Sequence, residues 1–173
     1  MVMQMLVAGG IPPFADDERV ADESNPKGYF EHDRVRALAA DASWIPEADG
    51  HALKVVAPLA VHLPAGPRYR VVMVERDLTE VLRSQAAMIQ RSDGAAAEAA
   101  VLRPAFERFL TATREWAERA EAVELLTLQH ADVLAAPESA AKRLAAFAST
   151  PNRPLDSPAM AAVVDPSLYR SRS

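Results

Sequence analysis

The junction of a strand and a helix within residues 69–85 constrains the fold of this chain most strongly. Its first part contains four consecutive apolar residues, VVMV at 71–74. Such a run is typical of a parallel strand that is covered on both faces. The next four residues, DLTE at 77–80, have the form of a capping box, with Asp77 as the N-cap and Glu80 at the third helical position. The sequence therefore predicts a buried strand that passes directly into a helix.

Strand-like and helix-like segments alternate along the rest of the chain. Further strands are predicted at residues 52–57 and 123–128, and further helices at 1–8, 32–40, up to about 120, 137–148 and 160–164. Gly9-Gly10 would end the first helix. This alternation predicts an α/β fold, a mainly parallel sheet flanked by helices, in a single domain over residues 1–173. The core face of the longest helix is predicted to be Leu102, Phe106, Phe109, Leu110, Thr113, Trp116 and Ala117.

Composition and charge exclude several classes of function. The net charge of −5 argues against a nucleic-acid backbone as the main partner. The chain has no cysteine, which excludes disulfides, thiolate zinc sites and cysteine nucleophiles. No spacing of histidines and carboxylates predicts a metal site. The apolar start, Met1 to Leu6, is too short to cross a bilayer or to act as a secretory signal, so we expect a cytoplasmic protein.

The strand–helix junction also carries a candidate anion site. Arg76 lies at the carboxyl end of the predicted strand, where ligands bind in parallel α/β sheets. The helix that follows offers free N–H groups and the positive end of its dipole, and Ser84 lies two turns into it. A guanidinium and a hydroxyl together can hold a phosphate. The alternative is that Arg76 pairs with a nearby carboxylate such as Glu75, Asp77 or Glu80.

Several segments, in order, resemble sulfotransferases. RYRVVMVERDLTEVLRSQ is similar to the strand and helix that grip the 3′-phosphate of the sulfuryl donor, and ALKVVAPLAVHLP is similar to the strand and loop before it. LLTLQHADVLAAP resembles a later strand and acidic turn, and ADESNPKGYFEHDRVRAL and AVVDPSLYRSR resemble a bacterial branch of the family. The resemblance implies a P-loop NTPase-like fold and 3′-phosphoadenylyl sulfate as donor, with adenosine 3′,5′-bisphosphate as product and no metal.

The same resemblance implies roles for single residues. Arg76 and Ser84 would bind the donor's 3′-phosphate. Lys54 would stabilise the negative charge that builds on the bridging oxygen as the S–O bond breaks, because a fixed cation there lowers the barrier. The alternative for Lys54 is a lysine at a strand end that extends its ammonium to water.

The general base is a point where this sequence departs from the family. Cytosolic members carry a histidine two residues after the lysine, whereas this chain has Val56, which cannot take a proton. Glu31 is the first alternative base, because a carboxylate beside aromatic residues can have a raised pKa. Other candidates are Asp22 and Glu23, then His51 and His62. Alternatively, Glu31 serves only the start of the helix near His32.

The phosphate loop is the second departure. The family begins with a strand and a Gly-rich loop that cradles the 5′-phosphosulfate, and this chain shows no such loop. Gly9-Gly10 follows a helix instead, so the resemblance implies a sulfotransferase fold without its first strand and phosphate loop, truncated at the N-terminus. Two functions remain: sulfuryl transfer to a hydroxyl or amine of a small-molecule acceptor, or nucleotide or partner binding without catalysis. An exposed sheet edge would favour self-association.

Overall fold

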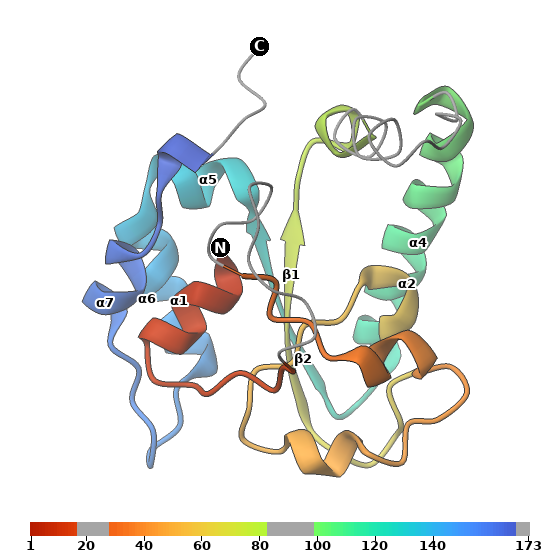
Figure 1. Cartoon of the computed structure of the whole chain (residues 1–173), viewed down its shortest axis with the longest axis horizontal. Coiled ribbons are helices and arrows are strands. Elements are labelled where there is room, and N and C mark those ends of the chain that lie inside the picture. The colour runs from red at the N-terminus through yellow and green to blue at the C-terminus, as the bar shows by residue number, and fades with distance from the viewer. Residues whose placement is uncertain (17–27, 83–98, 169–173) are drawn as a thin grey trace.

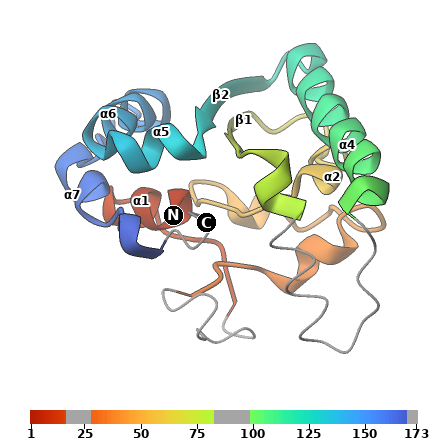
Figure 2. The ribbon, with the colours of Figure 1, turned by 90° about the horizontal axis from the view of Figure 1, so that it is seen from above.

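The computed structural model describes residues 1–16, 28–82 and 99–168, and Figure 1 shows its arrangement. The chain is mixed α/β, with a small parallel sheet and several helices. The sheet lies between two groups of elements (Figures 1 and 2). One group contains α1 (Val2–Ala8), α5 (His130–Ala135), α6 (Pro137–Ala148) and α7 (Ser157–Ala162). The other contains α2 (Ala57–Ala60) and α4 (Ala99–Arg119).

The sheet of the described residues has two parallel strands, β1 (Tyr69–Glu75) and β2 (Val123–Gln129). They pair over their full length, from Tyr69 opposite Val123 to Glu75 opposite Gln129. Both strands were predicted from their apolar runs, and the parallel α/β class is confirmed at this level. The apolar run of β1 is not covered evenly, since Met73 is buried but Val74 is 39% exposed.

The helix after β1 begins as the capping box predicted. Residues 78–82 are helical, and the backbone N–H of Glu80 donates to Oδ1 of Asp77 at 3.1 Å. This bond satisfies one of the donors that a helix start leaves open. It also places the start of the helix against the carboxyl end of β1, next to Arg76.

The long helix α4 contacts α2 and β2. Thr113 and Ala117 are buried, as predicted, and the hydroxyl of Thr113 donates to the carbonyl oxygen of Ala57 at 2.8 Å. Phe109 was predicted to be in the core and is 43% exposed, so this prediction is wrong. Helical spacing selects the apolar stripe of α4, but the described elements cover only part of it.

One hydrophobic core joins α1, α5, α6, α7 and β2. Its most deeply buried side chains include Met5, Leu128, Val133, Leu144 and Met160. The pair Gly9-Gly10 follows the last residue of α1, as predicted, and each position favours glycine for its own reason. A Cβ at Gly9 would lie 2.7 Å from the side chain of Met160, and Gly10 has a φ of 105°, which favours glycine.

A second core lies under two short 3-10 helices, η1 (Asp33–Ala37) and η2 (Ile45–Ala48). It contains Val35, Leu38, Trp44 and Ile45. The predicted helix at 32–40 is therefore a shorter 3-10 turn. A last 3-10 helix is η3 (Pro166–Leu168).

The prediction of a strand at 52–57 is wrong. Only Ala52 makes a bridge, with Pro13, and Ala57 already begins α2. Pro58 explains the change, because its ring fixes a φ suited to the first turn of a helix and removes a backbone donor that a strand would need. Lys54 thus lies on an extended connection rather than in the sheet.

Candidate functional site

Arg76 follows β1 directly and lies beside the capped helix start. Its Nε donates to Oε2 of Glu80 at 2.9 Å, one helical turn on, and the two side chains are 27% and 24% exposed. The alternative that the sequence left open, a carboxylate partner for Arg76, is therefore present. Ser84 lies outside the described residues, so its pairing with Arg76 stays a prediction.

His130 is a residue of this edge that the sequence did not single out. It follows β2 directly, as Arg76 follows β1, and the last residues of the two strands are register partners. Burial lowers the pKa of His130 most, the positive charge of Arg76 lowers it further, and Glu80 opposes them. The signal that could have found it is positional, since the residues after neighbouring parallel strands meet at one edge of the sheet.

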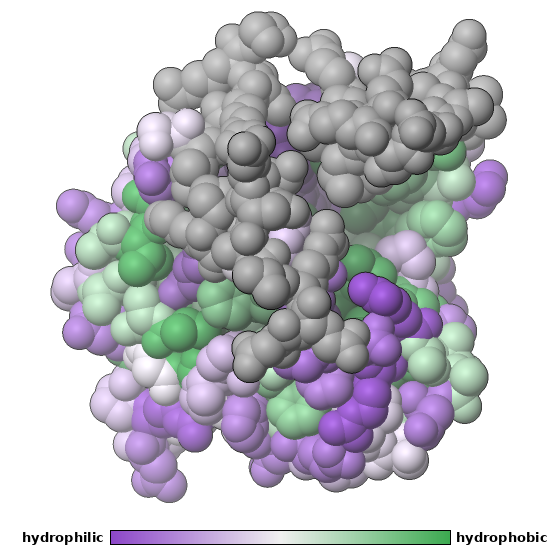
Figure 3. Space-filling model, in the orientation of Figure 1, coloured by the Kyte–Doolittle hydropathy of each residue, from purple (hydrophilic) through white to green (hydrophobic). Residues whose placement is uncertain are grey.

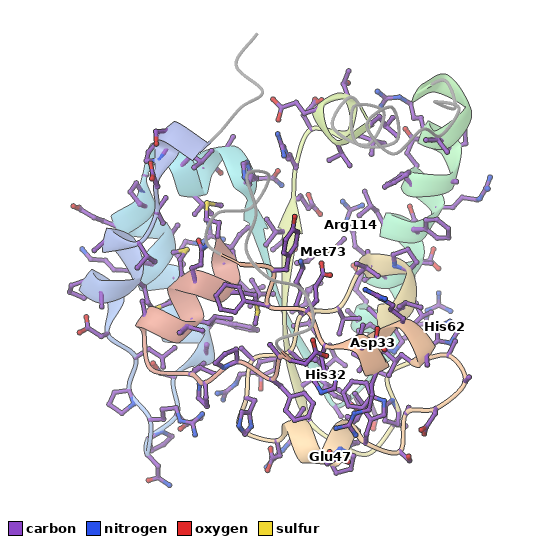
Figure 4. All side chains as sticks on the ribbon, viewed as in Figure 1. His32, Asp33, Glu47, His62, Met73 and Arg114 are labelled. Carbon is purple, nitrogen blue, oxygen red and sulfur yellow. The ribbon has the colours of Figure 1, made fainter. Side chains whose placement is uncertain are left out.

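Glu75, the last residue of β1, ties this edge to α4. Its Oε1 accepts from Nε of Arg114 at 2.9 Å, and its Oε2 accepts from Nε2 of Gln129 at 2.8 Å. Figure 4 shows Arg114 extending from α4 into the space beside β1. The bonds from Arg114 are the main cause that lowers the pKa of Glu75 below its usual range, so the carboxylate is ionised at neutral pH.

The structure brings Lys54 and Glu31 together. Nζ of Lys54 donates to Oε1 of Glu31 at 2.9 Å and to the carbonyl oxygen of Tyr29 at 3.1 Å. The two charged side chains are about one third exposed, at 36% and 33%. Residues 23 positions apart in the sequence therefore form one ion pair that can still reach a ligand.

A small pocket of about 140 Å³ lies beside this ion pair. One part of its wall is apolar and another is charged. Val56 lines it and is 54% exposed. Figure 3 shows hydrophilic residues gathered over the segment that contains η1. The full lining is Asp16, Glu31, His32, Asp33, Val35, Arg36, Lys54, Val56 and Leu59.

His32 is a second residue that the sequence did not place at a site. Its ring stacks on Phe14 with centroids 4.8 Å apart, and its Nδ1 lies 3.5 Å from Oδ2 of Asp16. Figure 4 shows His32 and Asp33 together at the start of η1. The imidazole is therefore held at the pocket by stacking and by polar contacts.

The other candidate bases have different places. His51 and His62 are exposed and do not line this pocket. Asp22 and Glu23 lie outside the described residues. Arg76 does not line the pocket either.

Among residues 1–16, 28–82 and 99–168, no group of three histidine or carboxylate side chains is placed to hold a metal ion. Over the same residues, no helix combines the length and apolarity needed to cross a membrane.

Comparisons with known proteins gave no match: no family model fits the sequence, and no curated protein and no solved structure is significantly similar to the chain.

Proposed function

We propose that this chain is a sulfotransferase-like protein that moves a sulfuryl group from 3′-phosphoadenylyl sulfate to a hydroxyl or amine of a small acceptor. The observation that carries the proposal is the 2.9 Å contact between Lys54 and Glu31 beside the pocket. The resemblance to sulfotransferases implies Lys54 as the stabilising cation, and Glu31 is the first candidate for the general base that Val56 cannot be. Their contact supports a shared role at one reacting centre.

The two residues divide the chemistry. The acceptor oxygen or nitrogen attacks sulfur, the bond from sulfur to the bridging phosphate oxygen breaks, and the acceptor proton passes to the carboxylate of Glu31. Lys54 stabilises the charge that develops on the bridging oxygen. An ammonium has three donors, and within the described residues two of them are given to Glu31 and Tyr29. The third can meet an oxygen of the sulfuryl group.

Arg76 is the proposed anchor of the donor's 3′-phosphate. It lies at the carboxyl end of a parallel strand and beside a capped helix start, which is where anions bind in α/β folds. Glu80 takes the Nε donor, and a guanidinium carries five N–H donors. A phosphate bound at Arg76 would share the guanidinium with Glu80.

A second function is favoured by one specific observation. Val56 is open to the pocket and cannot take a proton, although its position carries the base in cytosolic sulfotransferases. The alternative is therefore a degenerate relative that binds the nucleotide, or a partner, without catalysing transfer.

Two measurements on the full chain separate these functions. Calorimetry with adenosine 3′,5′-bisphosphate tests the donor site, with Arg76→Ala as the disrupted variant and Arg119→Ala as a control for a solvent-facing arginine of α4. A transfer assay with labelled donor and a panel of alcohols and amines tests catalysis. Binding with transfer supports the first function, and binding alone supports the second. A chain that neither binds the nucleotide nor transfers the label overturns the sulfotransferase assignment.

A further inference from the structure

Glu75 receives hydrogen bonds from two elements at the point where β1 ends. Nε and Nη2 of Arg114 on α4 both donate to its Oε1. Nε2 of Gln129, its register partner on β2, donates to Oε2. The side chain of Glu75 is only 19% exposed, so water competes weakly for these bonds. One carboxylate therefore joins β1, β2 and α4.

These hydrogen bonds, called the Glu75 tie below, also affect the next residue, Arg76. Glu75 is the last residue of β1, and Arg76 follows it directly. Because the hydrogen bonds fix the chain at Glu75, they limit the directions open to the next side chain, whose Nε donates to Glu80 at 2.9 Å. The same tie fixes Gln129, which immediately precedes His130.

We propose that Glu75 is a positioning residue that sets the orientation of the Arg76 guanidinium by tying the carboxyl end of β1 to α4 and β2. The benefit for anion binding rests on the proposed function of Arg76. Glu75 itself does not contact the anion. A free carboxylate next to a phosphate-binding group would weaken phosphate binding, and here the ion pair with Arg114 neutralises that charge.

The same two strands provide a matched control. Arg70 and Glu124 are also register partners, with Nε and Oε1 3.8 Å apart, and they lie near the amino ends of β1 and β2. Glu124→Gln therefore removes a similar cross-strand charge at a point far from Arg76. Gln129→Met offers a milder version of the test. Gln129 is exposed, and its replacement removes only the hydrogen bond to Oε2 of Glu75.

The first test measures the orientation of Arg76 without any ligand. In the full chain, the ¹⁵N–¹H signal of Arg76 Nε is assigned and compared among the variants. We expect Glu75→Gln and Gln129→Met to shift or broaden this signal, and Glu124→Gln to leave it unchanged. An Arg76 signal that stays in place in both Glu75→Gln and Gln129→Met overturns the proposal, whatever the nucleotide does.

The second test asks whether the effect passes through Arg76. We expect Glu75→Gln to weaken adenosine 3′,5′-bisphosphate binding by about 10-fold, as for loss of a charge-assisted bond that orients a binding group. In an Arg76→Ala background the same change should have no further effect, because the two act as a unit. Additive losses would overturn the proposal and give Glu75 a merely structural role. Failure of the unchanged chain to bind the nucleotide counts against the proposed function, while the Arg76 signal still decides the positioning role.

Discussion

The Lys54–Glu31 pair and the Arg76–Glu80 pair have the same 2.9 Å separation but different structural origins. Arg76 and Glu80 are one helical turn apart, and a helix cap and a three-element tie surround them. Lys54 and Glu31 come from two irregular segments, and their geometry depends on how those segments pack. The first pair is determined locally, whereas the second depends on tertiary structure.

This difference suggests that the two regions have different tasks. The locally determined edge is suited to a constant task, such as holding the phosphate of a common donor. The pocket on irregular segments is suited to a variable task, such as accepting a particular small molecule, because binding residues on loops can change without altering the scaffold. Variants of the two regions should therefore affect different steps.

The largest effect is expected at the pocket. Lys54→Met and Glu31→Gln should each lower the rate of sulfuryl transfer by roughly 10²–10³-fold, because one removes the cation at the developing charge and the other the proton acceptor. Neither should change nucleotide affinity. Single-turnover assays and calorimetry measure the two quantities. Glu47→Gln, which breaks the nearby Arg34–Glu47 pair, serves as the control and should leave the rate unchanged.

A smaller effect is expected from a change of cation at the sheet edge. Arg76→Lys keeps the charge but loses the planar fork, so the affinity for adenosine 3′,5′-bisphosphate should fall by about 10-fold. The transfer rate at saturating donor should change little. If Arg76→Lys lowered the saturated rate while leaving affinity intact, the proposed roles of the two regions would be exchanged.

The local origin of the Arg76 region explains why the sequence predicted so much of it. The cap and the carboxylate partner of Arg76 follow from residues 76–80, and the strand comes directly before them. The parallel class also followed, because β1 and β2 are both apolar runs separated by a helix.

The predictions that failed depended on tertiary context or on a competing local signal. The apolar spacing of α4 placed Phe109 in the core, but burial of that position depends on which elements cover the helix. The apolar run at 52–57 resembles a strand until Pro58 is weighed against it. His130 and the Glu75 tie were missed because their partners lie on elements that are distant in the sequence.

A modest loss of stability is expected when the helix cap at the sheet edge is removed. Asp77→Ala deletes the acceptor for the Glu80 N–H and should lower Tm by about 2–4 °C. Asp77→Asn can still cap the helix and should remain within a degree of the unchanged chain. Thermal unfolding at neutral pH measures both. The nucleotide affinity of Asp77→Ala should also fall, because the cap holds Glu80, the partner of Arg76. The Lys54–Glu31 pocket should be unaffected.

The smallest effect concerns the titration of His130. Its pKa is lowered from 6.5, first by burial and then by the charge of Arg76. The unfolded chain therefore binds a proton more readily than the folded one, and the stability that this group contributes is present above pH 6.5 and is lost as pH falls towards the lower folded value.

Arg76→Ala removes one of the lowering charges, so the pKa of His130 should move back towards 6.5, and the fall of stability on acidification should become shallower. NMR titration of the His130 ring measures the pKa directly. An unchanged His130 pKa in Arg76→Ala would show that the charge of Arg76 does not act on His130. The two strand ends would then carry independent groups rather than one site.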